Sequence, residues 1–341
     1  MISRFASSLR GIKRRSMSDG SMLQRRPSSL TDFSLNPLEE KYNTVAVIGA
    51  GGVGAACASN LILLKACSEV LLVDIAEDRC EGEALDLQDA GFVTGVRCNH
   101  ATYEEAGQAD VVVITAGVGQ KPGEPRTSLI GRNYNILKSI FKSMEPLNPD
   151  AVIIVVSNPC DVLTYLAQKL SGLDRKQVFG SGTFLDSQRF RIAVSHKLKV
   201  APSAVNAFVL GEHGDSQFAA TSHATIGGVP FSSFPELTPE FLKQAEADAR
   251  NRAYEIIAKK GATYHGIGAC VATMIDCIFL NERLVFPLSV LEKEANVCVS
   301  QPAVLGRSGI EAILPIPMSE EEKKLYDDSC AAMRAILDEV A

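Results

Sequence analysis

Four short apolar runs rich in β-branched residues constrain the first half of this 341-residue chain more than any other feature. They lie at residues 44–48, 69–74, 110–115 and 151–157. Runs of this kind are typical of strands buried on both faces of a parallel sheet. The segments between them favour helices, at about residues 55–65, 79–90, 130–145 and 160–170. Strands that alternate with helices predict an α/β fold with a doubly wound parallel sheet.

The second half of the chain, from about Gly182 on, has a more mixed pattern. Helices are expected near residues 183–198, 238–260, 263–280 and 319–339, and strands near 205–210, 217–229 and 284–305. This pattern predicts an α+β lobe that packs on the first part. We therefore divide the chain into a tail (1–42), a parallel α/β domain (43–181) and an α+β domain (182–341).

Composition and charge exclude several classes of protein. Hydrophobic residues make up 46% and charged residues 22%, which is usual for a globular protein and unlike a disordered one. No run reaches the roughly 20 apolar residues that span a bilayer, so no integral membrane contact is expected. The formal charge of −6 argues against a nucleic-acid partner.

Nine cysteines are scattered along the chain without a C-x-x-C pair. This arrangement indicates neither a disulfide framework nor a zinc site, and no metal is expected. We expect the cysteines to pack as small apolar core residues in a reducing compartment.

The N-terminal tail differs in charge from the rest of the chain. Residues 1–38 contain seven Lys/Arg and two acidic residues, so they carry +5 while the rest carries −11. On a helix, Ile2, Phe5, Leu9 and Ile12 fall on one face, with arginines largely opposite. These features favour an organelle-import presequence and hence a mitochondrial location. The alternative is a disordered, phosphorylated tail on a cytoplasmic protein.

A G-x-G-x-x-G pattern covers residues 49–54, between the first apolar run and the first helix. In this position Gly49 permits a tight turn, Gly51 lets the backbone approach a pyrophosphate and Gly54 allows close helix–strand packing. Asp74 ends the second run, where its carboxylate suits ribose hydroxyls and repels a 2′-phosphate. The pattern predicts a Rossmann-type site for NAD rather than NADP, the alternative being a glycine-rich structural turn.

Three further motifs carry candidate chemistry. His213 stands in GEHGDS, where glycines let a ligand approach, and its ordinary pKa of about 6.5 suits proton transfer. Asp186 and Arg189 are three residues apart on an expected helix, so they form either a surface ion pair or a site in which Arg189 binds a carboxylate. The loop 119–126 follows the third strand, where a lid is expected.

Together with Ser157-Asn158-Pro159, these motifs resemble the L-lactate/malate dehydrogenase family, in the family's order, over about residues 43–340. The resemblance implies that His213 donates and accepts the proton, oriented by Asp186. It implies that Arg189 grips the substrate carboxylate and that Arg126, on the lid, polarises the carbonyl. It also implies a homo-oligomer, with a tetramer as the family's form.

The remaining site residues follow from the same resemblance. Asn158 is expected near the nicotinamide and the substrate oxygen, and Asn133 on the cofactor side. The cofactor-binding candidates are Gly49, Gly51, Gly52, Val53, Gly54, Asp74, Thr115, Ala116, Gly117, Asn133 and Asn158. Gln120 stands where malate-selective members carry Arg, and Thr263 matches the opposite wall. Because Gln120 offers no charge to a second carboxylate, pyruvate/L-lactate is favoured over malate or another L-2-hydroxy acid.

Two other classes of protein remain as alternatives. One is an NAD-binding protein without turnover, against which the presence of His213, Asp186, Arg189 and Arg126 argues. The other is an NAD-dependent glycosidase, which would need a metal site that the sequence does not suggest.

Overall fold

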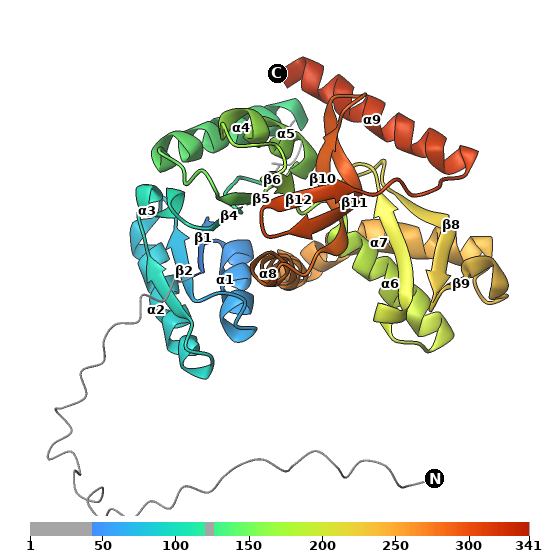
Figure 1. Cartoon of the computed structure of the whole chain (residues 1–341), viewed down its shortest axis with the longest axis horizontal. Helices are drawn as coiled ribbons and strands as arrows, with labels where there is room; N and C mark the ends of the chain where they lie inside the picture. Colours follow the sequence, from blue (N-terminus) through green and yellow to red (C-terminus); the bar gives the residue numbers. More distant parts are fainter. Residues whose placement is uncertain (1–42, 120–125, 341) are drawn as a thin grey trace, which may run out of the picture. The chain divides into compact units, whose positions relative to one another are not determined.

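The computed structural model describes residues 43–119 and 126–340, and of Arg126 and Thr127 only the backbone (Figure 1). The predictions for the tail (1–42) and for Gln120 therefore lie outside the described residues. Residues 42–341 form one compact unit, to which every described residue belongs.

Six parallel strands form the first part of a sheet that has nine strands within the described residues. They are β1 (Thr44–Ile48), β2 (Glu69–Val73), β3 (Arg97–His100), β4 (Val111–Ile114), β5 (Val152–Val155) and β6 (Val178–Gly180). Their order is β6-β5-β4-β1-β2-β3. Strand β1 is central and pairs in parallel with β2 and β4. The chain thus winds outward from β1 in both directions, which confirms the predicted doubly wound sheet.

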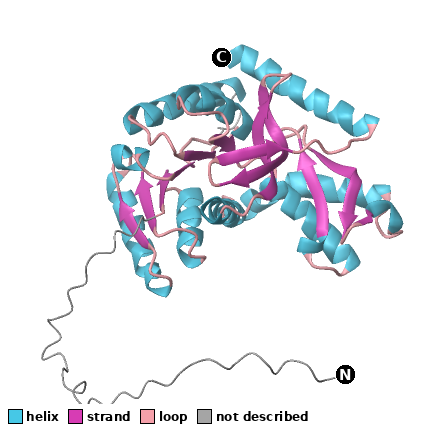
Figure 2. Cartoon of the chain, in the orientation of Figure 1, coloured by secondary structure: helices cyan, strands magenta, loops and turns pink. Residues whose placement is uncertain are grey.

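Helices cover both faces of this sheet, as Figure 2 shows. In the whole described chain, the helices are α1 (Gly52–Leu63), α2 (Glu77–Ala90), α3 (Tyr103–Gly107), α4 (Arg126–Met144), α5 (Cys160–Leu170), α6 (Phe184–Leu198), α7 (Pro239–Lys260), α8 (His265–Leu280) and α9 (Glu320–Val340). Short 3-10 turns lie at Gly91–Val93, Pro202–Ala204 and Phe231–Ser233. Strand β1 is apolar throughout because both of its faces are buried. Val45 and Val47 join one core with α1 and α8, and Ala46 and Ile48 join the opposite core with α4, α5 and α9.

The C-terminal half contains two sets of antiparallel strands. Strands β7 (Val205–Leu210), β8 (Phe218–Ile226) and β9 (Val229–Pro230) form a separate three-stranded sheet. Strands β10 (Leu284–Glu292), β11 (Val297–Gly306) and β12 (Gly309–Ile313) instead continue the main sheet beyond β6. The junction pairs Ser289 of β10 with Gly180 of β6. The predicted α+β content is confirmed, but three of its strands extend the first sheet and cover the edge that β6 would otherwise expose.

Four short elements of the described chain were not predicted: β3, α3, β6 and β12. Strand β3 reads RCNH and is exposed at its end, and β6 has three residues, so neither gives a periodic apolar signal. The expectation that the cysteines pack in the core is confirmed, because all nine are buried and free. Burial raises the pKa of Cys57 and Cys160 to about 12. In the described part of the chain, no helix is both long and apolar enough to cross a membrane.

Candidate active site

The glycine turn between β1 and α1 has the geometry that its sequence pattern predicts. Gly49 has φ +109°, a conformation that favours glycine, and a Cβ there would lie 2.8 Å from Thr115 Oγ1. A Cβ on Gly54 would lie 1.7 Å from the carbonyl oxygen of Gly49, so the helix can start this close to the strand only with glycine. Gly51, at the N-cap of α1, has open space where its Cβ would be. The N-terminus of α1 can therefore be approached by a phosphate.

Asp74 joins this turn from the end of β2. Its Oδ2 accepts the N–H of Ala50 at 2.7 Å, and its Oδ1 accepts the N–H of Ala76 at 2.9 Å. Each carboxylate oxygen keeps further lone pairs for another donor. The glycine turn, Asp74 and the free end of α1 thus fit a dinucleotide, with the acidic residue placed to accept ribose hydroxyls.

The segment after β4 closes the turn on its other side. Thr115 Oγ1 lies 3.0 Å from the carbonyl of Ile48 and 3.1 Å from that of Gly49, and it has one proton to donate to this pair. Asn133 of α4 is buried, and its Oδ1 accepts the N–H of Val118 at 2.9 Å. Its Nδ2 donates to the carbonyls of Val118 and Asn158 at 3.2 and 2.8 Å. Asn133 therefore braces two loops of the site from within the protein.

His213 lies just beyond the end of β7 and is bound to Asp186 of α6. The two side chains meet at 2.8 Å between His213 Nδ1 and Asp186 Oδ2. The other oxygen of Asp186 accepts a hydrogen bond from Arg189 Nη1 at 3.1 Å. Arg189 Nη1 also donates to the carbonyl of Ala249 on α7, and no other nitrogen of Arg189 is bonded within the described residues. Its remaining guanidinium donors are thus left for an anion.

The electrostatics of this cluster suit proton transfer. Burial alone would lower the pKa of His213, but the hydrogen bond and negative charge of Asp186 outweigh it and raise that pKa. Burial alone would raise the pKa of Asp186, but His213 and Arg189 hold it below its usual range. Asp186 thus stays ionised beside an imidazole that is readily protonated near neutral pH.

Sequence analysis missed one residue of the site, Asp161. It lies in the first turn of α5, 2% exposed, and its Oδ2 accepts the backbone N–H of His213 at 2.7 Å. Burial raises its pKa to about 6, although the hydroxyl of Ser289 and the His213 N–H oppose this. The available signal was a lone acidic residue beside Asn158-Pro159, at the head of an apolar helix.

The comparisons with known proteins agree with this geometry. Residues 43–180 match the NAD-binding domain of lactate/malate dehydrogenases, and residues 183–341 match their alpha/beta C-terminal domain. The chain is 46% identical over 295 residues to L-lactate dehydrogenase A of Rhizopus oryzae, covering 86% of this chain and 92% of that protein. It is 37% identical to L-lactate dehydrogenase 1 of Clostridium acetobutylicum, covering 88% and 99%.

A solved structure of the minor L-lactate dehydrogenase of Enterococcus mundtii, in a ligand-bound form, superposes with a TM-score of 0.84. It is 36% identical and covers 88% of this chain and 98% of its own. The chain belongs to the lactate/malate dehydrogenase family. In this family the first domain binds NAD, and here that domain contains the glycine turn and Asp74.

The remaining predicted residues of this family member are placed as follows. Asn158 is exposed after β5, where its backbone carbonyl is bound by Asn133. Thr263 is half-buried between α7 and α8. Arg126 begins α4, but its side chain is outside the described part, as is Gln120. Among the described residues, no cluster of three His, Cys, Asp or Glu could hold a metal ion.

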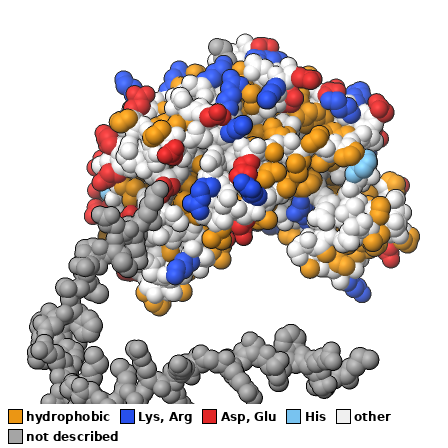
Figure 3. Space-filling view, in the orientation of Figure 1, with side chains coloured by type: hydrophobic (Ala, Val, Ile, Leu, Met, Phe, Trp, Pro, Cys, Tyr) orange, Lys and Arg blue, Asp and Glu red, His pale blue; other side chains and the backbone are white. Residues whose placement is uncertain are grey.

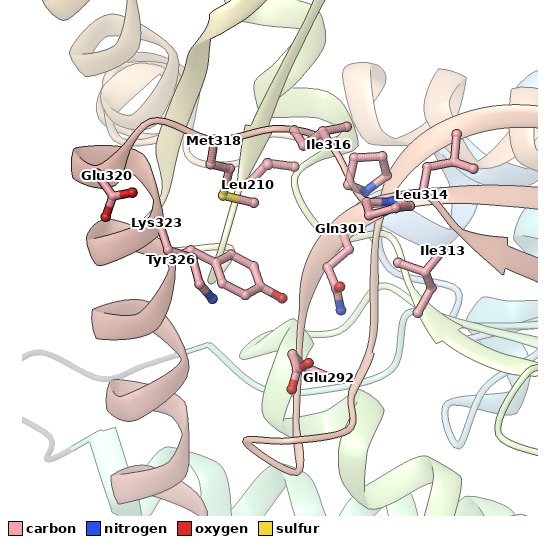
Figure 4. A pocket seen from close by; sticks show the side chains of 12 residues that line it. Leu210, Glu292, Gln301, Ile313, Leu314, Ile316, Met318, Glu320, Lys323 and Tyr326 are labelled. Atoms are coloured by element: carbon pink, nitrogen blue, oxygen red, sulfur yellow. The ribbon is translucent and has the colours of Figure 1, made fainter.

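A cavity of about 500 Å³ lies away from these residues, between β12 and α9. Figure 4 shows Tyr326 and Lys323 of α9 on one side and Ile313 and Leu314 on the other, with Gln301 between them. Apolar side chains also gather in this region of the surface in Figure 3. None of the predicted site residues lines this cavity.

Proposed function

We propose that this protein is an L-lactate dehydrogenase that interconverts pyruvate and L-lactate with NADH and NAD. The observation that carries the proposal is the network of Arg189, Asp186 and His213. In it, a group that can bind a carboxylate and a group that can donate a proton are both hydrogen-bonded to the same buried aspartate. The relatives named L-lactate dehydrogenase, which match over most of the chain, support the same activity.

Residues of this chain move the proton to and from the reacting carbonyl. When bound, NADH supplies the hydride. Because His213 Nδ1 is held by Asp186, Nε2 is the nitrogen that gives its proton to the carbonyl oxygen of pyruvate. Asp186 stabilises the imidazolium before the transfer and holds the ring in place afterwards. In the reverse direction, neutral His213 takes the proton of the lactate hydroxyl.

Substrate binding uses the groups around this pair. Arg189 offers its unbonded guanidinium nitrogens to the substrate carboxylate, a pairing that favours two parallel hydrogen bonds. Asn158 is exposed and available to the substrate oxygen and the nicotinamide. Arg126 is assigned to the carbonyl when the 119–126 loop closes. The residues from 43 to 181 are assigned to NAD and those from 182 to 341 to the substrate, with Asn158 reaching across this division.

Substrate choice is assigned to Gln120 and Thr263, which favour pyruvate over oxaloacetate. The test measures initial rates of NADH oxidation with both substrates, for wild type and for Gln120→Arg. We expect wild type to prefer pyruvate, and Gln120→Arg to raise the oxaloacetate-to-pyruvate ratio of kcat/KM at least about tenfold, or 1.4 kcal/mol. A wild type that prefers oxaloacetate would instead make the protein a malate dehydrogenase.

The proposal extends to assembly as a homotetramer. Besides the family resemblance, it is supported by large apolar side chains on the surface, of which Ile75 and Phe92 are 88% and 87% exposed. Sedimentation equilibrium gives the assembly mass, and a monomer at micromolar concentration would contradict this part.

Residues 1–38 are proposed to direct import into mitochondria, on the strength of their +5 charge beside a −11 remainder. Fusion of these residues to a fluorescent reporter tests this. A reporter that stays in the cytosol would support the cytoplasmic alternative, and a chain that starts near Leu38 should keep full activity.

A further inference from the structure

The loop that carries His213 is tied to the C-terminal helix α9 by one buried hydroxyl. Ser329 of α9 has no exposed surface, and its Oγ accepts the backbone N–H of Glu212 at 2.7 Å. The same Oγ lies 3.0 Å from Ser216 Oγ. Ser329 thus contacts the residue before His213 and a residue three positions after it, although 117 residues of sequence separate it from Glu212.

The directions of these hydrogen bonds follow from the donors that each group has. Ser216 Oγ donates to Glu212 Oε2 at 2.7 Å, because a carboxylate accepts and does not donate. Its only proton is therefore used, so the bond between the two hydroxyls has Ser329 as its donor. The result is a closed ring: Glu212 N–H to Ser329, Ser329 to Ser216, and Ser216 back to Glu212.

The start of the loop is shaped to let α9 come this close. Gly211 has φ +85°, and a Cβ at this position would lie 2.8 Å from Ser329 Oγ. Glycine is thus required here both for the backbone conformation and for the approach of the helix. The close contact between the loop and α9 therefore depends on a glycine at position 211.

The loop has other anchors, which fix its backbone from other directions. Asp161 accepts the N–H of His213 at 2.7 Å, and Gly211 exchanges two backbone hydrogen bonds with Ser300 of β11. With these in place, Ser329 sets the position of residues 212–216 along α9. A displacement of about 1 Å in a reacting group can lower a rate by about 100-fold.

We propose that Ser329 is a positioning residue for His213, acting through Glu212 and Ser216 to hold the imidazole against Asp186. This inference rests on the proposed lactate dehydrogenase activity. It assigns a role in catalysis to α9, whose residue Ser329 reaches the reacting groups only through the loop.

The test uses the pH dependence of the reaction as its main readout. Asp186 and Arg189 of α6 and Asp161 of α5 are the charged groups that face His213. If the loop drifts, the ring separates from Asp186, and the pKa of His213 falls toward its ordinary value of about 6.5. Pyruvate reduction needs the protonated ring, so the fall of kcat/KM at high pH should begin at lower pH.

The decisive variant is Ser329→Ala in the full-length chain, with Cys330→Ala as its matched control. Cys330 is the next residue of α9, is also buried, and has Tyr326 and Glu292 as its electrostatic neighbours rather than the loop. We expect Ser329→Ala to lower kcat/KM for pyruvate about 10- to 100-fold and to leave NADH affinity unchanged. The fall of kcat/KM at high pH, here called the pH limb, should move to lower pH. Cys330→Ala should lower Tm with no change in the pH limb.

Ser216→Ala breaks the same ring from the partly exposed side and decides the question should Ser329→Ala fail to fold. Because the hydroxyls act as one unit, the double variant should lose little more than either single one. An unchanged kcat/KM and pH limb in either folded single variant would overturn the proposal, and so would additive losses. Absence of pyruvate-dependent NADH oxidation in wild type would instead reject the proposed function.

Discussion

The glycine turn and the His213 cluster are built in opposite ways. The turn comes from one stretch of chain, residues 49–54, and its shape depends on the absence of side chains. The cluster brings together α5, α6, the end of β7 and α9, and depends on side chains that contact one another. The first kind of site depends mainly on the residues of one short segment, whereas the second kind depends on each of the elements that meet in it.

The largest expected effect separates the two regions by function. His213→Ala removes the proposed proton donor and should lower kcat for pyruvate by about 100- to 10,000-fold. The glycine turn and Asp74 make no described contact with His213, so NADH affinity should remain within about twofold of wild type. Stopped-flow kinetics and NADH fluorescence titration measure the two quantities. An equal loss of NADH binding would show that the two regions depend on each other.

A smaller effect is expected from Asp186→Asn, which leaves the imidazole in place and removes the charge beside it. Loss of that charge should lower the pKa of His213, because the negative charge of Asp186 is what raises it. Because the raised pKa keeps the ring protonated at higher pH, the variant should lose kcat/KM for pyruvate at lower pH than wild type. At pH 8, kcat/KM for pyruvate should be about 10- to 100-fold lower than in wild type. A pH profile measured at saturating NADH checks this. A profile that keeps its midpoint would contradict the pairing.

The turn is tested by two glycine substitutions, both of which should weaken NADH binding but only one of which should destabilise the fold. Gly54→Ala places a methyl group against the Gly49 carbonyl, and should cost about 3 kcal/mol of unfolding free energy as well as NADH binding. Gly51→Ala has open space for its methyl group, so it should keep the stability of wild type and lose NADH affinity. Thermal melts with and without NADH measure both. Equal destabilisation by the two variants would contradict the open space at Gly51, and unchanged NADH affinity in Gly51→Ala would show that this space has no role in binding.

The last expected effect is on stability alone and concerns Asp161, which belongs to the NAD-binding domain by sequence and to the His213 cluster by contact. Its folded pKa of about 6 lies above the unfolded value, so its protonated form is the one that folding favours. Its contribution to stability is thus full at low pH and is lost as the pH rises from about 4 to about 6. This loss is about 3 kcal/mol, and Asp161→Asn should not show it.

Urea denaturation of wild type and Asp161→Asn between pH 4 and pH 8 measures this difference. The gap between the two unfolding free energies should move in favour of the Asn variant as the pH rises. A gap that stays constant across this range would mean that Asp161 ionises as an ordinary exposed carboxyl group.

The parallel sheet, the glycine turn and the motif residues could all be predicted from local sequence. Strands β1, β2, β4 and β5 are apolar on both faces because helices cover both, and this leaves a run that can be recognised without neighbours. Likewise Gly49 and Gly54 are fixed by local backbone geometry, so their spacing alone indicates their roles. His213, Asp186 and Arg189 were identified through motifs that match a family.

How these parts meet depends on contacts between distant segments of the chain. The continuation of the sheet through β10–β12 depends on the pairing of Ser289 with Gly180, which no local pattern signals. Asp161 and Ser329 look ordinary in sequence, and each owes its place to a hydrogen bond with the His213 loop, across 52 and 117 residues respectively. The physical reason is that propensity and periodicity report interactions between near neighbours in the chain, whereas these bonds exist only after distant helices have packed.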